Sequence, residues 1–277
     1  MCNYRKILVY KKKQINNKNM GKPPYFWDNV WSDEEFKHEL RLFLQFRPSK
    51  SIKYRIIRKF ITKKKIMKPT IVSIGCGSSL DILYTSKKLH LKPYLLDISP
   101  EALKLSKENS ERFKIDFVVK HGNILNIPLP SNFADIVYSG GVNEHFMGDD
   151  RLKTFDEMIR VAKSDGLIII EVPHANSPIY RLGKYVREKI GTFKILEVPY
   201  STKEVEKILS SISRKYTFEY EIIKESFLPS LVWLVPGRSY AVKKWFARVA
   251  NKRTLLDKYF GNALIVKIEK KPELINK

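Results

Sequence analysis

The chain has 277 residues, of which 43% are hydrophobic, and it carries a formal net charge of +23. This length is sufficient for a sizeable core, and the wide separation of the two cysteines, Cys2 and Cys76, excludes a disulfide framework and a cysteine zinc site. No apolar run approaches the length of a membrane-spanning helix, and the basic N-terminus lacks the apolar stretch of a signal peptide, so we predict a soluble cytoplasmic protein.

The positive charge is concentrated at the two ends of the chain. Residues 1–65 carry 18 Lys and Arg against 5 Asp and Glu, a net of +13, and residues 201–277 carry 16 against 8, a net of +8. The centre, residues 66–200, carries 18 against 16, a net of +2. Basic ends attract nucleic acid, anionic lipid or a phosphorylated substrate, but they are equally typical of a solvated Lys-rich surface. No zinc-finger pattern or aromatic RNA-binding signature decides between these interpretations.

The first part of the chain is predicted to be a tail followed by helices. Residues 1–19 contain six Lys and Arg and no acidic residue, so we expect a disordered basic tail. Amphipathic helices are predicted in residues 32–46 and 51–65, because each segment places its large apolar residues on one face. The first of them opens with Ser-Asp-Glu-Glu, a capping-box pattern. Residues 20–66 are therefore expected to form a helical cover on the domain that follows.

From residue 67 onward the pattern alternates between strands and helices. The predicted strands are Thr70–Ile74, Pro93–Asp97, Asp116–Lys120, Ala134–Ser139 and Leu167–Val172. The predicted helices are Leu80–Leu89, Glu101–Phe113 and Arg151–Ala162. Short runs rich in Ile and Val between helices predict an α/β fold, a doubly wound parallel sheet that binds its ligand at the carboxyl ends of the strands.

The turn after the first strand reads "TIVSIGCGSSLDI", residues 70–82. Gly75 and Gly77 give this turn conformational freedom and allow a ligand to approach the main chain. A phosphate-binding P-loop requires Lys-Ser or Lys-Thr after its second glycine, and none follows. A dinucleotide fingerprint requires Gly or Ala where Leu80 stands. The remaining interpretation is a nucleoside ligand without a pyrophosphate.

Asp97 supports a nucleoside ligand, because it ends the second strand twenty residues after Gly77. A carboxylate at this place can accept hydrogen bonds from both hydroxyl groups of a ribose. The structural alternative is that Asp97 caps the helix that begins near Pro100.

Five segments in order resemble the class I S-adenosylmethionine-dependent methyltransferases, and more closely the small-molecule, type 11-like members. "VSIGCGSS" is similar to the glycine-rich first motif of that family, and "LLDIS" to its acidic second motif. "HGNILNIPLPSNFADIVYS" resembles the stretch through the fourth strand, "VNEHF" the segment after it, and "RVAKSDGLIIIEVP" the turn and fifth strand. The resemblance covers roughly residues 67–175. It implies a Rossmann-like sheet of seven strands with the last strand antiparallel, and S-adenosyl-L-methionine as the cofactor.

The resemblance also implies a set of cofactor-binding residues. The methionine portion, the ribose, the adenine and the methyl group would be contacted by Ser73, Gly75, Cys76, Gly77, Asp97, Ile98, Asn123, Ile124, Ser139 and Gly140. Ser73 stands where the family usually has an acid, and Asn123 where it usually has Asp. Ser79 replaces the third glycine, and we expect it to cap the following helix, while Asp165 replaces a small or Pro position.

Three residues past strand ends are candidates for a general base: Glu144 and His145 after the fourth strand and His174 after the fifth. Each has a structural alternative, since Glu144 and His145 could order their loop and His174 could be a capping or solvent-facing residue. No carboxylate cluster accompanies Glu144, so no metal site is predicted.

Residues 176–200 and 227–261 are expected to cover the substrate. Strands are predicted at Phe218–Glu225 and Ala263–Glu269, and the resemblance implies that these are the last, antiparallel pair. The insertion between them contains Trp233, Trp245 and Phe246, which are typical of a core or, alternatively, of a membrane-surface helix.

The sequence thus predicts a methyltransferase acting on an O or N atom of a small molecule. The alternatives are an RNA or protein methyltransferase recruited by the basic ends, and a protein that binds the cofactor without transferring its methyl group. An oxidoreductase would require NAD binding.

Overall fold

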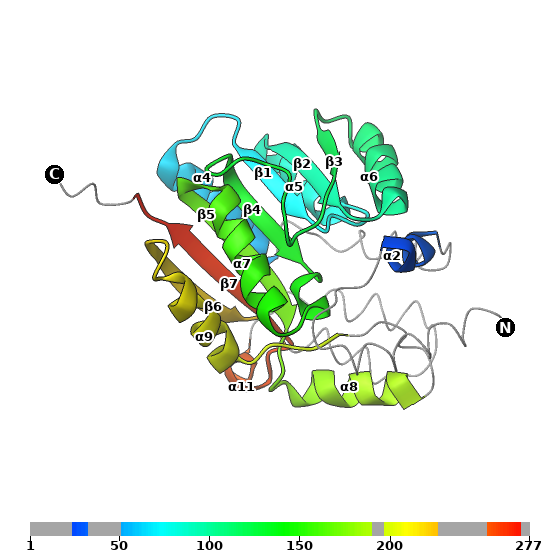
Figure 1. The fold of residues 1–277 in the computed structure, drawn as a ribbon, viewed down its shortest axis with the longest axis vertical. Helices are drawn as coiled ribbons and strands as arrows, with labels where there is room; N and C mark the ends of the chain where they lie inside the picture. Colours follow the sequence, from blue (N-terminus) through cyan, green and yellow to red (C-terminus); the bar gives the residue numbers. More distant parts are fainter. Residues whose placement is uncertain (1–23, 33–50, 190–196, 227–253, 273–277) are drawn as a thin grey trace.

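The protein is described by a computed structural model covering residues 24–32, 51–189, 197–226 and 254–272, and a seven-stranded sheet is its centre (Figure 1). The strands lie in the order β3-β2-β1-β4-β5-β7-β6. Their bounds are β1 Thr70–Ile74, β2 Lys92–Asp97, β3 Val118–His121, β4 Ala134–Gly140, β5 Ala162–Pro173, β6 Phe218–Lys224 and β7 Ala263–Lys270. Strand β7 pairs antiparallel with both β5 and β6, while the other pairs are parallel. The predicted doubly wound α/β fold with an antiparallel last strand is confirmed.

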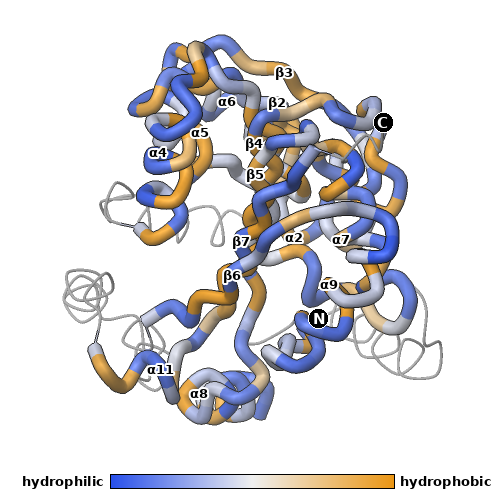
Figure 2. The backbone as a smooth tube through the Cα atoms, turned by 90° about the vertical axis from the view of Figure 1, so that its left-hand side faces the viewer, coloured by the Kyte–Doolittle hydropathy of each residue, from blue (hydrophilic) through white to orange (hydrophobic). Residues whose placement is uncertain are grey.

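Helices cover both faces of the sheet, as the edge-on view shows (Figure 2). The helices are α2 Pro24–Trp31, α4 Ile52–Lys64, α5 Leu80–Leu89, α6 Pro100–Phe113, α7 Asp149–Val161, α8 Pro178–Lys189, α9 Thr202–Ile212 and α11 Asp257–Phe260, with a 3-10 turn, η2, at Asn143–His145. Helices α4, α5 and α6 pack on one face, and α7 and α9 on the other. Alternate strand residues serve the two cores, so that Ile71 lies in one cluster and Val72 in the other.

The predicted strand and helix positions agree with the structure to within two residues, except at β5. This strand begins at Ala162 rather than at Leu167, because the turn sequence "AKSDG" is part of it. The pairing of Ala134 with Ala162 is followed by that of Ile136 with Leu167, so the β5 side contains extra residues in a bulge.

Serine side chains begin three of the helices. Ser51, Ser99 and Ser201 each accept a hydrogen bond from the main-chain N–H three residues later. For Ser201, the capping-box pattern with Glu204 predicts a reciprocal bond. In the structure the Glu204 carboxylate instead pairs with Arg151 of α7, so Glu204 joins α9 to α7.

Several predictions fall outside the described residues. These are the tail 1–19, the helix at 32–46, and most of the insertion 227–261 with Trp233, Trp245 and Phe246. Helices α2, α4 and α8 belong to the predicted cover segments. Among the helices that the structure describes, none is long and apolar enough to cross a membrane.

Candidate cofactor and acceptor site

The glycine turn after β1 has a left-handed backbone and lies beneath two apolar side chains. Gly75 and Gly77 have φ values of +60° and +50°, which strain any residue with a Cβ atom. A Cβ on Gly75 would be 2.4 Å from Val142 Cγ2, and one on Gly77 would be 2.3 Å from Trp31 Cη2. Glycine is therefore required here both by the backbone conformation and by close neighbours.

Asp97 lies beside this turn, at the end of β2. Its Oδ2 accepts a hydrogen bond from the main-chain N–H of Gly77 at 2.9 Å, and its Oδ1 accepts one from that of Ser99 at 2.9 Å. Burial raises the pKa of the carboxyl, the main-chain N–H groups oppose this change, and nearby Asp28 adds to it. Each carboxylate oxygen keeps a second lone pair that can accept from a ribose hydroxyl, so the turn and Asp97 together fit an adenosine-type ligand.

Helix α2 covers this corner, a placement that the sequence does not predict. Asp28 accepts from Ser99 Oγ at 2.5 Å and from the main-chain N–H of Glu101 at 3.4 Å, at the N-terminus of α6. An acidic side chain is favourable there because the helix N-terminus carries partial positive charge. With Trp31 against Gly77 and Asp28 against α6, α2 forms the outer wall of the predicted cofactor site. The only signal for this in the sequence is the aromatic run "YFWDNVW".

The residues predicted beside the adenine lie in different environments. Ile98 is half-buried after β2, and its carbonyl oxygen is 3.0 Å from His121 Nε2. Asn123 is exposed, and its Oδ1 accepts from the main-chain N–H of Leu125 at 2.9 Å. This bond fixes the amide within its own loop and leaves Oδ1 a second lone pair that can accept from a ligand. Ile124 is 5% exposed and belongs to the core cluster beneath α7.

The side chains of the glycine turn point into the protein rather than toward a ligand. Cys76 is buried, its Sγ lies 3.4 Å from Ser106 Oγ, and burial raises its pKa to about 12. Ser79 has a left-handed backbone and makes no capping bond, so the expectation that it caps α5 is wrong. Its hydroxyl lies 2.6 Å from Ser106 Oγ and therefore ties the turn to α6. Only the main chain of Cys76 is placed to line a cofactor.

Two residues predicted at the methyl end lie past or within β4. Ser139 is fully buried, and its hydroxyl donates to Asn143 Oδ1 at 2.9 Å, so its side chain orders η2. Gly140 is half-buried, and a Cβ on it would be 2.3 Å from the hydroxyl of Tyr138. Glycine is therefore needed at position 140 to make room for the Tyr138 hydroxyl.

A partly buried ionic cluster lies beneath Gly140. The ammonium group of Lys53 on α4 lies 2.7 Å from Asp81 Oδ2, 2.9 Å from Glu171 Oε2 and 2.8 Å from the hydroxyl of Tyr138. These two carboxylates hold the pKa of Lys53 well above its usual value, against the effect of burial. The cluster therefore has two carboxylates for one ammonium group.

This cluster is adjacent to the position that lacks the expected acid. Ser73 is 2% exposed and pairs in register with Tyr138. Carboxylates thus approach this end of the sheet from α5 and β5 instead of from β1. In the sequence, the indication of this cluster is a lysine on the apolar face of α4. Lys53 lies four residues before Ile57 and seven before Phe60, so the three side chains share one face of the helix.

Glu144, one of the predicted general bases, is a buried carboxyl group with an unsatisfied oxygen. The residue is 3% exposed, and its Oε2 has no hydrogen-bond partner in the described structure. Leaving a buried polar atom unpaired costs on the order of 1–3 kcal/mol. Burial raises the pKa of Glu144 well above its ordinary value, and Glu197 adds to the shift. An unpaired, water-excluded carboxyl group next to a strand end is typical of a site that receives a ligand.

The two predicted histidines are placed differently. His145 is half-buried, with Nε2 3.1 Å from the carbonyl oxygen of Gly141 and its ring 4.7 Å from that of Trp27. His174 is 1% exposed, and its Nδ1 lies 2.9 Å from the carbonyl oxygen of Gly261. Because a carbonyl only accepts, Nδ1 carries the proton, and burial lowers the pKa of this ring. The arrangement of His174 joins β5 to the turn before β7, which the alternative of a solvent-facing side chain did not foresee.

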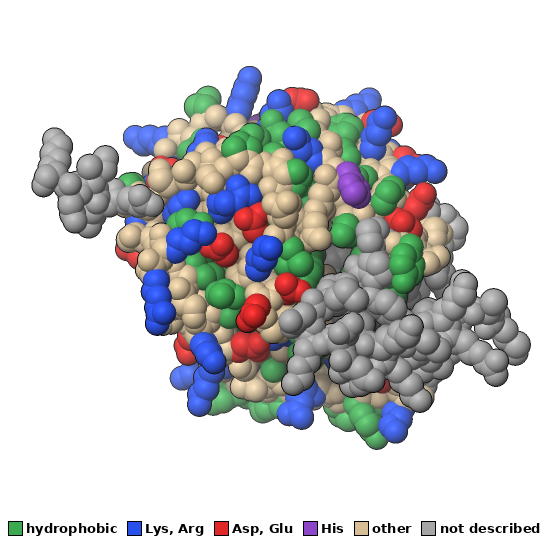
Figure 3. Space-filling view, viewed as in Figure 1, with side chains coloured by type: hydrophobic (Ala, Val, Ile, Leu, Met, Phe, Trp, Pro, Cys, Tyr) green, Lys and Arg blue, Asp and Glu red, His purple; other side chains and the backbone are tan. Residues whose placement is uncertain are grey.

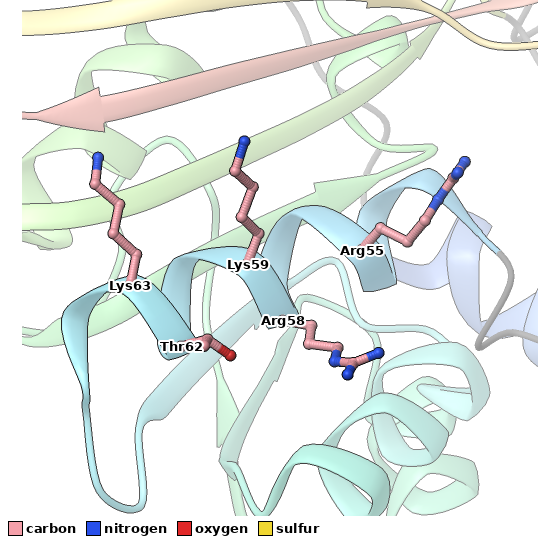
Figure 4. Close-up of a pocket in the computed structure, with 5 residues that line it drawn as sticks. All are labelled: Arg55, Arg58, Lys59, Thr62 and Lys63. Carbon is pink, nitrogen blue, oxygen red and sulfur yellow. The ribbon is translucent and has the colours of Figure 1, made fainter.

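The surface of α4 carries most of the basic groups that the structure describes near the N-terminus. Arg55, Arg58, Lys59 and Lys63 line a shallow hollow with Thr62 on the surface of α4 (Figure 4). On the face shown in Figure 3, Lys and Arg are interspersed with acidic side chains rather than gathered in one patch. Among the described residues, no group of three or more His, Cys, Asp or Glu is arranged to hold a metal ion.

Comparison with known proteins agrees with this geometry. Residues 72–170 match the family model described as "Methyltransferase domain". Ajmaline N-methyltransferase from Rauvolfia serpentina is 33% identical over 104 residues, which is 36% of this chain and 34% of that protein. The chain thus matches about a third of the length of this curated relative.

Solved structures share the fold at low sequence identity. A SAM-dependent methyltransferase from Thermotoga maritima aligns with a TM-score of 0.55 and 16% identity, over 86% of this chain and 98% of that one. Another from Archaeoglobus fulgidus aligns with a TM-score of 0.53 and 18% identity, over 82% and 96%. Residues 72–170 are thus similar in sequence to methyltransferase domains, and the chain shares the fold of S-adenosylmethionine-dependent methyltransferases.

Proposed function

We propose that this protein transfers a methyl group from S-adenosyl-L-methionine to an N or O atom of a small molecule. The observation that carries the proposal is the corner formed by the Gly75–Gly77 turn and Asp97, in which the N–H of Gly77 orients the carboxylate. Asp97 would hold the ribose, and the main chain of the turn would lie along the methionine portion. A cytoplasmic location is part of the proposal and rests on the sequence composition.

The chain has little chemistry to perform beyond positioning. When bound, the cofactor supplies a methyl group already activated by the sulfonium. Exposed Gly141 presents bare main chain just after β4, where an acceptor atom could approach closely. Helix α2 would keep water from one side of this site, which strengthens electrostatic interactions inside it. Glu144 is the predicted base that would take a proton from the acceptor, since its carboxyl group lies beside exposed Gly141 and its Oε2 has no partner in the described structure.

The named relative supports an N acceptor. The name of ajmaline N-methyltransferase gives nitrogen as the atom that it methylates, but the match covers only about a third of that protein's length. The [4+2]-cyclase SpnF also shares the fold, with a TM-score of 0.52 and 11% identity, so the fold by itself does not establish methyl transfer.

A second candidate is methylation of an RNA or protein drawn by basic residues. The outward row on α4, Arg55, Arg58, Lys59 and Lys63, is the described feature that favours it. Binding to RNA through such a row would weaken steeply as salt is raised, whereas transfer to a small molecule would not depend on it. Replacing these four residues with Ala and measuring RNA binding at two salt concentrations separates the candidates.

The direct experiment is a transfer screen with cofactor labelled in the methyl group. Fractions of a cell extract, divided into small molecules, RNA and protein, are incubated with the protein and labelled S-adenosylmethionine. The proposal expects label in the small-molecule fraction. Label confined to RNA or protein would support the second candidate, and cofactor binding without any transfer would support a non-catalytic binding protein.

A further inference from the structure

We propose that the acceptor is a cationic amine, and that Glu144 binds its ammonium group. This inference rests on the proposed function and goes beyond it by naming the class of substrate. It starts from the one carboxyl group near the end of β4 whose Oε2 has no partner in the described structure.

The carboxyl group of Glu144 is held in a fixed position close to the strand end. Asn143, the preceding residue, accepts from Ser139 Oγ, donates to Thr154 Oγ1 at 2.9 Å, and its carbonyl accepts from the hydroxyl of Tyr200 at 3.1 Å. These bonds fix the turn η2 that carries Glu144. A Cβ built on Gly141 would lie 3.8 Å from Glu144 Oε1, and Gly141 is exposed. The Oε1 side of this carboxyl group therefore lies next to an exposed glycine just after β4.

A second carboxylate lies next to Glu144. The main-chain N–H of Val198 donates to the carbonyl oxygen of Glu144 at 2.8 Å, which brings the segment 197–200 against η2. Glu197 in that segment accepts from the hydroxyl of Tyr180 on α8 at 2.8 Å. The titratable and charged groups that act on Glu144 are Glu197, Glu171, Arg151, Tyr180 and Tyr200.

Arg151 is the cation among these groups, and its guanidinium is already used. It pairs with Glu204, donates to the carbonyl oxygens of Phe146 and Val198, and lies 3.9 Å from the ring centroid of Tyr200. Arg151 therefore opposes the upward shift in the pKa of Glu144 only as a minor effect, behind burial and Glu197. Burial and Glu197 are therefore the main causes of the raised pKa of Glu144, and a bound cation would offset both.

The chemistry of the unpaired oxygen selects a ligand that brings N–H donors and positive charge. An ammonium group pairs with the carboxylate and can offer another N–H toward Glu197. An alcohol brings one donor and no charge, so beside it the buried Glu144 stays protonated and no charge–charge attraction is gained. Aromatic rings near this place, such as Tyr180 and Trp27 beside His145, are also favourable neighbours of an organic cation.

The transfer step is balanced with Glu144 as the base. The acceptor ammonium gives one proton to the Glu144 carboxylate, and the freed nitrogen lone pair forms the new N–C bond to the methyl group. The C–S bond breaks, and its electron pair stays on sulfur as a neutral thioether. Glu144 later releases its proton to water, so no oxidant or reductant is involved.

Binding of matched amines and alcohols tests this inference apart from catalysis. The protein is first titrated with S-adenosylhomocysteine by calorimetry, and the saturated complex is then titrated with three pairs of probes. The pairs are benzylamine and benzyl alcohol, phenethylamine and 2-phenylethanol, and tryptamine and tryptophol. The same titrations are made with Glu144→Gln and with Glu219→Gln, a matched control whose side chain is 75% exposed on β6.

The expected result is that at least one amine binds about tenfold or more tightly than its alcohol. Glu144→Gln should bring this ratio close to one, while Glu219→Gln should leave it unchanged, and S-adenosylhomocysteine should bind equally to all three proteins. If no amine binds more tightly than its alcohol, or if Glu144→Gln keeps the preference, the inference is overturned. Failure of S-adenosylhomocysteine to bind the unaltered protein would instead overturn the proposed function.

Discussion

The main-chain N–H of Gly77 donates to Asp97 Oδ2 at 2.9 Å and joins the turn after β1 to the end of β2. The two residues are twenty positions apart, yet the parallel pairing of β1 with β2 brings them to the same edge of the sheet. This bond and the one from the N–H of Ser99 fix both oxygens of the carboxylate, and each oxygen keeps a second lone pair for a ligand. The proposed cofactor site depends on this arrangement.

Replacing Gly77 with Ala should destabilise the protein more than the same change at Gly141. Both glycines have positive φ, but a Cβ on Gly77 would meet the Trp31 ring at 2.3 Å, whereas the nearest atom to one on Gly141 is 3.8 Å away. We expect Gly77→Ala to cost about 1–3 kcal/mol more in the free energy of unfolding, measured by urea denaturation.

The double variant Gly77→Ala/Trp31→Ala identifies the cause of that cost. If the indole is the obstacle, removing it should make the Gly77→Ala change less costly than it is in the unaltered protein. Equal costs in the presence and absence of Trp31 would show that α2 does not lie against the turn in solution.

Lys53→Met should destabilise the protein by about 1–3 kcal/mol, because it leaves Asp81 and Glu171 without their shared cation. The expected loss is less than for a fully buried pair, since the side chains of Lys53, Asp81 and Glu171 remain 18%, 33% and 23% exposed. Lys59→Met, on the solvent side of the same helix, should change the unfolding free energy by less than about 0.5 kcal/mol.

The effect of Lys53→Met should also depend on pH. The pKa of Asp81 is lowered in the folded protein and that of Lys53 is raised, so the stabilisation by this pair is fully present from about pH 4 to about pH 10.5. It is lost as the pH falls through the folded pKa of Asp81, or rises through that of Lys53. Denaturation at pH 7 and pH 3 should therefore show a smaller difference between the two proteins at pH 3. An equal difference at both values would contradict the ion pairing.

The thiol of Cys76 should react slowly in the native protein. Burial raises its pKa to about 12, so at pH 8 the thiolate fraction is on the order of a thousandfold below that of a free cysteine. Alkylation with iodoacetamide, followed by mass spectrometry of the peptide that contains Cys76, measures this separately from Cys2. Rapid labelling without denaturant, compared with labelling in urea, would show that the turn opens in solution.

The strands, the helices and the glycine corner could be predicted because their signals are local. The Ile and Val runs of β1 and β4, and the Gly75–Gly77 turn, reflect periodicity and backbone freedom within a few residues. Asp97 could be assigned to the same site as the turn, because each follows a strand of a parallel pair and the carboxyl ends of such strands lie at the same edge of the sheet. Ser79 was predicted wrongly, since its left-handed backbone turns the hydroxyl away from the helix N–H groups and toward Ser106.

The rest of the site depends on contacts between distant parts of the sequence. The partners of Lys53 are 28, 85 and 118 residues away in the sequence. No local pattern predicts these contacts, and the only indication is a lysine on the apolar face of a helix. The placement of Trp31 over Gly77 likewise depends on how α2 docks on α6. The environment of Glu144 is set by Glu197 and Tyr180, which follow it by more than thirty residues.

Calorimetric titration with S-adenosylmethionine tests the central claim most directly. The unaltered protein should bind one equivalent, and Asp97→Ala should weaken binding about a hundredfold, because hydrogen bonds from ribose hydroxyls to a carboxylate are lost. Asp97→Asn keeps the shape of the side chain and shows whether weaker binding by Asp97→Ala comes from unfolding. The matched control is Asp116→Ala, because the side chain of Asp116 is 81% exposed. No binding by the unaltered protein, or undiminished binding by folded Asp97→Ala and Asp97→Asn, would contradict the account.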